Sequence, residues 1–369
     1  MPEYYPIKTA ISKLVAGSDL SEFEASATIE EIMEGIATPS QIAAFLTAIR
    51  MKGVSVDELT TFAASMKRHA LKICPKVNDR LVDTCGTGGD KLKTFNISTI
   101  AAFVTSGAGV PVAKHGNRSF SSKCGSADLL EKLGVNINAD PQTVQNSIEQ
   151  ADIGFMFAPV FHPAMKHVAV PRKEIGIMTM FNILGPLTNP AGAKVQIVGV
   201  YDDSLVRPIA QVLTRLGVED VIVVHGEGGI DEVSPVGSTH VARKAEGDKE
   251  IRDEVLDPLA TFGLELRTFD EISAEGANID TYATMALSVL SPDSTKLTPR
   301  ERATKEMVLM NSSAALVTSK MAVDYLEGID LAKNAIQSGK ALDKLVSLVK
   351  YTNGDRGRIE SLLHNRQRI

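Results

Sequence analysis

Apolar residues recur at helical spacing through the first 75 positions. Residues 18–36 and 39–53 each place large apolar side chains three or four positions apart. Capping-box pairs at Thr38–Gln41 and Ser55–Glu58 predict where the second and third helices begin. The pattern therefore predicts a small N-terminal helical lobe, residues 1–75, made of three helices. Few of its polar residues suit chemistry, so packing or dimerisation is the role we expect for it.

From Leu81 onward, short β-branched runs alternate with helical segments. The predicted strands are 81–85, 110–114, 154–160, 194–200 and 220–226. The predicted helices are 98–109, 126–135, 205–218, 299–320 and 331–350, with a partly helical stretch at 162–176. This alternation predicts an α/β lobe, residues 76–369, with a mostly parallel central sheet and flanking helices. Part of 165–195, which includes a proline-rich connection, is expected to pack on the helical lobe or to form a hinge.

Composition narrows the class of protein. The chain has 369 residues, a formal net charge of −6, 5% aromatic residues and no Trp. Such a balance disfavours nucleic-acid binding, which needs basic surface and often aromatic platforms. Three cysteines without a C-x-x-C pair favour a reducing, cytoplasmic setting. The start, MPEYYPIKTA, does not resemble a signal peptide, and no apolar run is long enough for a membrane span.

The segment DTCGTGGDKLKTFNIST, 83–99, joins a predicted strand to a predicted helix through three glycines. It is not a dinucleotide fingerprint, because Lys91 stands where the last glycine is required, and it lacks the G-K-[ST] of a Walker loop. A tight turn would by itself explain one glycine. Three glycines followed by hydroxyl and amide side chains favour an anion or phosphate site at the strand end.

A second polar loop follows the next strand. KHGNRSFSSKCGSADLLEKLG, 114–134, offers Lys114 and Arg118 as cations, and Asn117 and several serines as hydrogen-bond donors. A solvated surface loop is the alternative. Loops at successive strand ends of an α/β sheet lie close together, so the two loops predict a ligand with two separate phosphate groups.

Two further motifs carry candidate chemistry. Asp231 and Glu232 follow the strand 220–226, and adjacent carboxylates beside a phosphate site fit Mg²⁺, which binds few carboxylates plus substrate phosphates. An acidic surface turn is the alternative. Arg172 is a candidate carboxylate ligand because its guanidinium binds carboxylates bidentately. His162 and His167 are five residues apart, which does not suit a metal pair on one helix face.

Taken in order, five motifs resemble the anthranilate phosphoribosyltransferase family over nearly the whole chain. They are GTGGD-x₃-T-x-N-[IV]-S-T, KHGNR-x₂-SS-x₂-GSAD, HPAM, R-x₃-G-x₂-T-x-FN-x-LGPL-x-NP and G-x-DEVSP. The resemblance implies transfer of a phosphoribosyl group from 5-phosphoribosyl 1-diphosphate (PRPP) to anthranilate in tryptophan biosynthesis. It also implies two lobes joined by a hinge, two Mg²⁺ per site and a homodimer formed through the helical lobes.

The resemblance also implies the site residues. PRPP would be bound by Gly86, Gly89, Asp90, Thr94, Asn96, Ile97, Ser98, Thr99, Lys114, His115, Gly116, Asn117, Arg118, Ser119, Phe120, Ser121, Ser122 and Ser126. Anthranilate would be bound by Gly86, His115, Asn117, His162 and Arg172, and Mg²⁺ by Ser98, Asp231 and Glu232. Two departures stand out: Met178 where a basic residue is expected, and Lys91 and Lys93 where small residues are usual.

No residue is predicted to act as an acid or base, because the aromatic amine is already neutral at pH 7. Lys114, Asn117 and Arg172 are instead expected to position the reactants. Three alternatives remain at this stage. They are a phosphoribosyltransferase for another aromatic acceptor, a pyrimidine nucleoside phosphorylase and a non-catalytic nucleic-acid-binding relative. The residues of both loops and the intact acidic pair favour the transferase over the last two.

Overall fold

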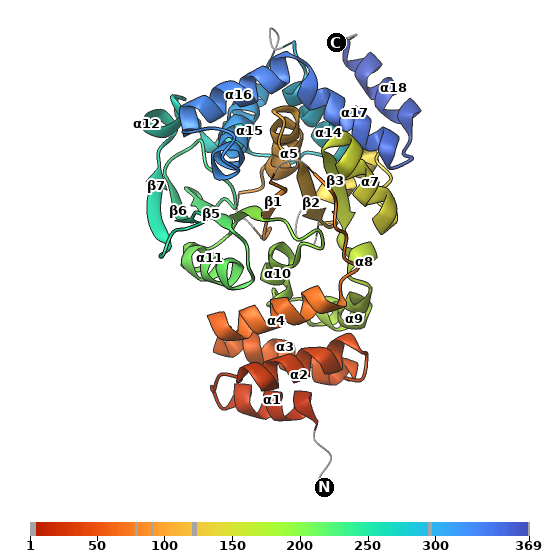
Figure 1. Ribbon diagram of the computed structural model, residues 1–369, viewed down its shortest axis with the longest axis vertical. Helices are drawn as coiled ribbons and strands as arrows, with labels where there is room; N and C mark the ends of the chain where they lie inside the picture. The colour runs from red at the N-terminus through yellow and green to blue at the C-terminus, as the bar shows by residue number, and fades with distance from the viewer. Residues whose placement is uncertain (1–4, 78–79, 90–91, 120–123, 294–296, 368–369) are drawn as a thin grey trace.

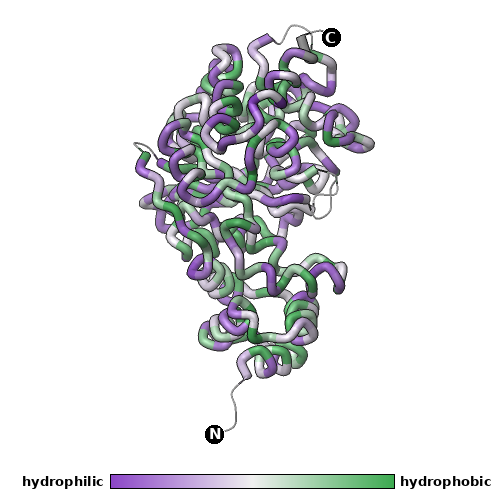
Figure 2. Tube along the Cα trace, turned by 90° about the vertical axis from the view of Figure 1, so that its right-hand side faces the viewer, coloured by the Kyte–Doolittle hydropathy of each residue, from purple (hydrophilic) through white to green (hydrophobic). Residues whose placement is uncertain are grey.

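The computed structural model describes residues 5–77, 80–89, 92–119, 124–293 and 297–367. Four helices form the N-terminal lobe: α1 (Pro6–Val15), α2 (Glu22–Met33), α3 (Pro39–Lys52) and α4 (Val56–His69). Capping boxes begin α2, α3 and α4, as expected for the last two. Helix α1 was not predicted, because it starts at Pro6 behind Tyr5, whose side chain makes no capping hydrogen bond. Figure 2 shows polar and apolar stretches alternating along these helices, as in helices that bury one face.

A seven-stranded sheet forms the centre of the larger lobe, in the order β3-β2-β1-β4-β5-β6-β7. Its strands are β1 (Val82–Gly86), β2 (Val112–Gly116), β3 (Ile153–Phe157), β4 (Val195–Gly199), β5 (Asp220–Gly226), β6 (Thr239–Lys244) and β7 (Arg252–Leu256). The first five are parallel, and β6 and β7 are antiparallel. The predicted fold class, a helical lobe beside a mostly parallel α/β lobe, is confirmed. The last two strands were missed, since β7 is a largely exposed edge strand of polar residues.

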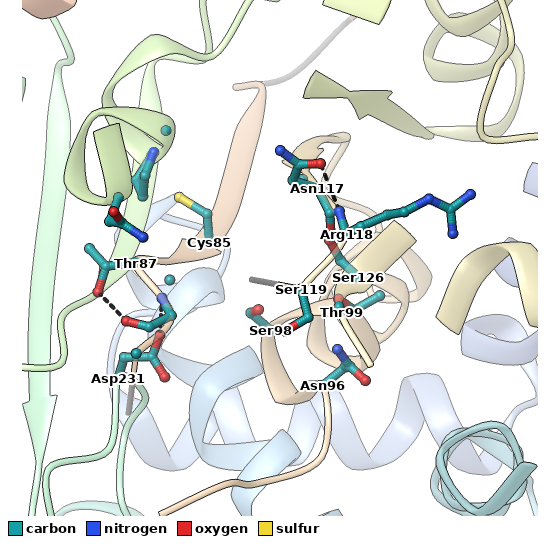
Figure 3. Close-up of a pocket in the computed structure, with 18 of the residues that line it drawn as sticks. Cys85, Thr87, Asn96, Ser98, Thr99, Asn117, Arg118, Ser119, Ser126 and Asp231 are labelled. Carbon is teal, nitrogen blue, oxygen red and sulfur yellow. Dashed lines mark hydrogen bonds between the residues drawn. The ribbon is translucent and has the colours of Figure 1, made fainter. Parts of the chain in front are cut away.

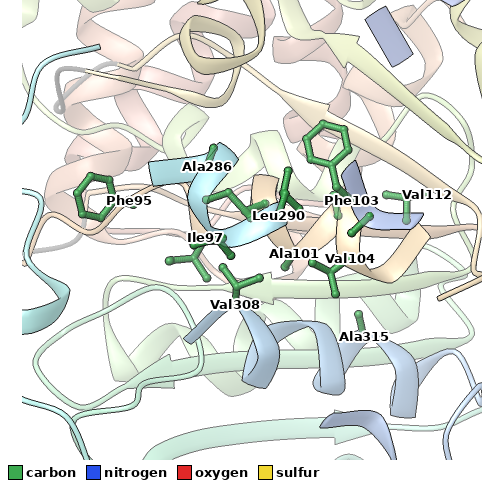
Figure 4. Packing of buried hydrophobic residues seen from close by; sticks show 14 of the residues in the cluster. Phe95, Ile97, Ala101, Phe103, Val104, Val112, Ala286, Leu290, Val308 and Ala315 are labelled. Atoms are coloured by element: carbon green, nitrogen blue, oxygen red, sulfur yellow. The ribbon is translucent and has the colours of Figure 1, made fainter. Parts of the chain in front are cut away.

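Helices cover both faces of the sheet (Figure 1). On one side, α5 (Ile97–Gly107) contacts α15 (Pro299–Thr318), α16 (Tyr325–Gln337) and α17 (Lys340–Tyr351). Figure 4 shows side chains of α5, including Ala101 and Val104, packed beside Leu290, Val308 and Ala315. The other helices are α6 (Ser126–Lys132), α7 (Pro141–Ala151), α8 (Ala158–Phe161), α9 (Lys166–Ile175), α10 (Phe181–Leu184), α11 (Val206–Arg215), α12 (Pro258–Phe262), α13 (Phe269–Ile272), α14 (Ile279–Leu290) and α18 (Arg356–Gln367).

The opposite face of the sheet shares its core with the helical lobe. Helix α11 contacts β5, β6 and α4, and one buried cluster joins Phe45 and Phe62 of the helical lobe to Ile209 and Val223. Helix α9 contacts α2 and α3, while α4 contacts α10 and the 3₁₀ turn Gly185–Thr188. Residues 166–188 therefore lie between the helical lobe and the sheet.

Two predicted boundaries were wrong. The strand predicted over 154–160 ends at Phe157, and the short helix α8 follows it with a proline in its first turn. The helix predicted over 331–350 is divided into α16 and α17, because Gly339 takes a φ of +80° that interrupts the helical path. Across the described residues, we find no helix with both the length and the apolar character required to cross a bilayer.

Candidate active site

A cavity of about 310 Å³ lies at the carboxyl ends of β1 and β2. Its lining brings together five segments that are distant in sequence: the glycine loop after β1, the loop after β2, Ala158 of α8, residues within 172–186, and the acidic pair after β5. Figure 3 shows Ser98, Asn117, Ser119 and Asp231 around this space. The two loops therefore converge on one cavity, as the sequence predicted.

The glycine loop is held against the acidic pair. Gly88 donates its backbone N–H to Asp231 Oδ2 at 2.8 Å, from a φ of +64° that glycine adopts without strain. A Cβ at Gly86 would lie 2.5 Å from the same carboxylate oxygen, so only glycine allows β1 to approach Asp231 this closely. Glycine is thus required at both positions, in one case by conformation and in the other by space.

Glu232 holds the start of the following helix. The N–H of Ser98 in the first turn of α5 donates to Glu232 Oε1 at 3.0 Å, while Asn96 at the N-cap makes no side-chain capping hydrogen bond. Glu232 thus satisfies one of the backbone donors that a helix leaves without an intrahelical partner. The two adjacent carboxylates reach opposite ends of the same loop.

The acidic pair also fits a divalent cation. Both carboxylates are at least nine-tenths buried, and burial raises the pKa of Asp231. Buried carboxylates are costly without compensating positive charge. With the hydroxyl of Ser98 nearby, they form an oxygen-only ligand set that suits Mg²⁺, which takes further ligands from water and phosphate.

Lys114 lies in the middle of β2 and lines the cavity. Its ammonium donates to the Thr84 carbonyl at 2.5 Å and lies 3.4 Å from Ser98 Oγ. Burial lowers the pKa of Lys114, while the carboxylates of Asp83 and Glu232 act in the opposite direction. Lys114 therefore places its side-chain nitrogen beside Ser98, whose N–H is bound by Glu232 of the acidic pair.

Asp83 is a residue that the sequence reasoning missed. It is fully buried in β1; its Oδ1 accepts from His115 N–H at 3.2 Å and its Oδ2 from Gln196 Nε2 at 3.3 Å. Burial raises its pKa, and the positive charge of Lys114 opposes that rise. Asp83 thereby joins β1, β2 and β4 below the cavity. A charged residue inside the apolar run LVDTC was the signal that could have identified it.

The opposite wall of the cavity is formed by α9 and the segment after it. Arg172 Nη2 lies 3.5 Å from Asn182 Oδ1, and its guanidinium lies over the ring of Phe181, 5.5 Å from the centroid. Burial lowers the pKa of Arg172, so the side chain presents a partly desolvated cation at this wall. Met178 also lines the cavity, beside Gly89.

His115 lines the cavity and packs against a second buried histidine, His162. The rings of His115 and His162 are 5.0 Å apart, and His115 Nδ1 donates to the Gly185 carbonyl at 3.2 Å. Burial lowers the pKa of His115 to about 3 and that of His162 to about 4, so both rings are neutral at pH 7. Neither Nε2 atom has a hydrogen-bond partner among the described residues.

Nearly all of the predicted site residues that the structure describes line the cavity. The exception is His162, which is absent from the lining but lies against His115. Asp90, Phe120, Ser121, Ser122 and Lys91 lie outside the described residues. Lining residues that the sequence reasoning did not assign to a ligand include Cys85, Thr87, Gly88, Phe95, Cys124, Ala158, Phe181, Asn182, Gly185 and Pro186. The last four belong to the proline-rich connection, which we had treated only as structural.

Two family models match the helical lobe and the α/β lobe of this chain separately. Residues 8–70 match a family model described as the helical bundle domain of a glycosyl transferase family, and residues 78–342 match the a/b domain of that family. Anthranilate phosphoribosyltransferase of Acetivibrio thermocellus is 48% identical over 347 residues, which cover 94% of this chain and 97% of the relative. The chain belongs to the anthranilate phosphoribosyltransferase family. The resemblance inferred from the five motifs is thereby confirmed.

Solved structures of anthranilate phosphoribosyltransferases share the fold. The enzyme of Thermus thermophilus aligns with a TM-score of 0.84 at 36% identity, over 93% of this chain and 99% of that one. The Saccharomyces cerevisiae enzyme in complex with PRPP and Mg aligns with a TM-score of 0.83 at 28% identity, over 94% of this chain and 98% of that one. The same yeast enzyme has also been solved with 4-fluoroanthranilate, at a TM-score of 0.81, 28% identity and the same two coverages.

Proposed function

We propose that this protein transfers the 5-phosphoribosyl group of PRPP to the amine of anthranilate, which yields N-(5-phosphoribosyl)anthranilate and diphosphate in tryptophan biosynthesis. One observation carries the proposal: two polar loops, a buried acidic pair and a desolvated arginine line a single cavity. The two loops and the acidic pair suit a metal-bound diphosphate ester, and the arginine suits an aromatic carboxylate. A nucleoside phosphorylase or a nucleic-acid-binding relative would not require this combination.

The PRPP site in this proposal comprises the two loops. The glycine loop from Gly86 to Gly89 and the start of α5 would hold the diphosphate through backbone N–H groups, hydroxyls and the helix terminus. The loop from Lys114 to Ser119, together with Ser126, would hold the other phosphate. Support comes from their position at the carboxyl ends of neighbouring parallel strands, where α/β proteins bind ligands.

Mg²⁺ is the cofactor in this proposal, held by Ser98, Asp231 and Glu232, with two ions per site. The two carboxylates reach different ends of the glycine loop, which supports separate positions for two ions. When bound, Mg²⁺ offsets the negative charge of the diphosphate leaving group. Asp231→Asn combined with Glu232→Gln should abolish Mg²⁺-dependent turnover while the circular dichroism spectrum stays native. Turnover at the wild-type rate would refute the metal assignment.

Anthranilate is the acceptor in this proposal. Arg172 would bind its carboxylate, and Gly86 and Asn117 would contact it beside the PRPP ribose. The neutral rings of His115 and His162 would line its path and accept hydrogen bonds without adding charge. Since an aromatic amine is already neutral at pH 7, it can attack the ribose carbon without a general base.

Positioning provides the rate enhancement in this scheme. Lys114, Asn117 and Arg172 would hold the two reactants in line, an effect worth up to roughly 7–11 kcal/mol in favourable systems. Diphosphate leaves as the amine attacks C1 of the ribose, which gains positive charge in the transition state. We take residues 1–75 and 76–369 as the two domains, with part of 165–195 packed on the helical lobe or forming the hinge. Closure about this hinge would exclude water, which would otherwise hydrolyse PRPP.

We also propose a cytoplasmic homodimer that associates through the helical lobes. The helical lobe exposes large apolar side chains, of which Val15, Phe23, Ile36 and Met51 are the most exposed, and apolar exposure of this kind is common at subunit interfaces. The three cysteines form no disulfide in the described part of the chain, which agrees with a reducing compartment.

A fluorescence assay tests the reaction itself. Anthranilate fluorescence should fall only when protein, PRPP and Mg²⁺ are all present, and omission of any one should leave the signal constant. A further sample with another aromatic amine in place of anthranilate tests the identity of the acceptor. Constant fluorescence in the complete mixture, with a correctly folded protein, would exclude the proposed reaction.

A further inference from the structure

The loop between β2 and α6 is closed at its base. Ser126 Oγ and Ala127 N–H both donate to the Asn117 carbonyl at 3.2 Å, so the first residue of the loop is in direct contact with the first turn of α6. A Cβ at Gly125 would lie 2.3 Å from the Ser119 nitrogen, and only glycine permits this approach. The backbone of residues 117–119 therefore has a fixed relation to the start of α6.

Asp128, in the first turn of α6, binds both sides of this base. Its Oδ2 accepts the N–H of Gly125 at 2.9 Å and the N–H of Ser119 at 3.3 Å. Its Oδ1 accepts from Arg118 Nη1 at 2.6 Å. One carboxylate therefore holds two backbone groups and one side chain of the loop, and a change at Asp128 would release all three.

Glu131, one turn further along α6, completes the contact with Arg118. Its Oε2 accepts from Nη1 at 2.9 Å and its Oε1 from Nη2 at 3.1 Å, the two-bond geometry that makes arginine–carboxylate pairs strong and directional. The carbonyl of Glu131 in turn accepts from Arg358 of α18 at 3.0 Å. Figure 3 shows the Arg118 side chain extending away from Ser98, Ser119 and Asp231.

These contacts leave Arg118 poorly suited to bind a phosphate directly. Its single positive charge is offset by two carboxylates, which together raise its pKa. Exposed ion pairs add little to global stability, and the Arg118 side chain is 45% exposed. The consequence of the pairs is therefore local: they fix the direction of the backbone at 118–119.

We propose that Arg118 is a positioning residue and not a phosphate ligand. Arg118, Asp128 and Glu131 form a brace that holds the N–H groups of the second loop in place for a phosphate of PRPP. The inference rests on the proposed function, because it assumes that this loop binds PRPP. It differs from the expectation that Arg118 contacts PRPP itself.

A double-mutant cycle on Arg118 and Glu131 tests the brace. Arg118→Ala and Glu131→Gln should each raise KM for PRPP about tenfold, the effect of a lost charged hydrogen bond, and the double variant should add nothing. KM for anthranilate and the thermal midpoint should stay at wild-type values. Lys132→Ala is the matched control, since it removes an ion pair with Asp280 from the same helix without touching the loop.

Two further measurements separate the brace from a direct contact. Arg118→Lys keeps the positive charge but loses the two-bond geometry of the guanidinium. A brace therefore predicts a KM for PRPP as high as that of Arg118→Ala, whereas a phosphate ligand predicts a KM close to the wild-type value. A direct ligand also predicts that Glu131→Gln leaves or improves PRPP affinity, because it frees the guanidinium. Either result would overturn the inference while leaving the proposed function intact. A wild-type protein that does not consume PRPP with anthranilate would instead remove both.

Discussion

Arg172 reaches the cavity from the last turns of α9, where Asn182 and Phe181 surround its guanidinium. Partial burial strips water from the charge, so a carboxylate that binds there meets little competition from solvent. Met178 lies on the same wall and adds no second charge. This wall, which we propose as the acceptor site and call the acceptor wall, suits a molecule with one carboxylate and an apolar ring.

Replacement of Arg172 should separate the two substrates. Arg172→Ala should raise KM for anthranilate by about 10- to 100-fold, the range expected when a charged hydrogen bond is lost, and should change KM for PRPP much less. Lys173→Ala, an exposed neighbour on α9, is the control and should have no effect. An unchanged KM for anthranilate in Arg172→Ala would remove Arg172 from the acceptor site.

The buried histidines predict how stability depends on pH. In the folded protein the pKa of His115 is about 3 and that of His162 about 4, against an ordinary value of 6.5. Below pH 6.5 the unfolded chain therefore binds protons that the folded protein does not, and stability falls by up to about 1.4 kcal/mol per pH unit for each histidine. Well above pH 6.5 the two buried histidines contribute no pH dependence to stability.

Thermal unfolding between pH 4.5 and 7.5 measures this effect. The wild-type midpoint should fall as the pH drops below 6.5, and His162→Gln should show a shallower fall because it loses one of the two titrating groups. His364→Gln, on the exposed side of α18, is the control. Identical pH profiles for wild type and His162→Gln would contradict the neutral, buried state of His162.

At the scale of elements, the strand ends determine the site. Asp83 joins β1 to β2 through the His115 N–H and to β4 through Gln196, while Lys114 lies under the glycine loop. These contacts place the two loops at a fixed separation. The cavity therefore depends on polar groups buried within the sheet as well as on the loops that line it.

Asp83→Ala should destabilise the protein more than Asp83→Asn. The alanine variant removes one of the two carboxylates that act on the buried Lys114 and leaves the His115 N–H without its acceptor, at a cost of about 3 kcal/mol or more. Asparagine keeps an acceptor oxygen and the shape of the side chain, so part of the stability should return. Urea denaturation gives both values, and an alanine variant as stable as wild type would show that Asp83 does not hold the strands.

The same elements show what sequence patterns can establish. The glycine loop and its helix were predicted because a strand, a run of glycines and a helix start are all local signals. The missed contacts are long-range: Asp83 with Gln196, and Glu232 with Ser98, join residues more than 100 positions apart. Helix α1 and strand β7 were missed for another reason, since one lacks a capping side chain and the other an apolar alternation.

At the scale of the whole molecule, the helical lobe and the sheet share one hydrophobic cluster, and α9 lies between them (Figure 1). The segment that carries Arg172 also contacts α2 and α3, while both loops belong to the sheet. Movement of the helical lobe would therefore carry the acceptor wall toward or away from the PRPP loops. We propose on this basis that closure of the lobes would assemble the site.

The proposed dimer can be tested at the same scale. Analytical ultracentrifugation should give about twice the 39.5 kDa chain mass for the wild type. Phe23→Glu with Met51→Glu should shift the protein toward monomer, because it places charges on exposed apolar positions of the helical lobe. Val255→Glu, equally exposed on β7, should remain dimeric. A monomeric wild type, or a dimer lost only in Val255→Glu, would contradict association through the helical lobes.

Product analysis tests the central claim most directly. The protein is incubated with anthranilate, PRPP and Mg²⁺, and the products are identified by mass spectrometry while diphosphate is quantified. We predict one phosphoribosyl–anthranilate adduct and one diphosphate for each anthranilate consumed, and no reaction without Mg²⁺. Diphosphate release without the adduct, or unchanged anthranilate beside consumed PRPP, would contradict the account.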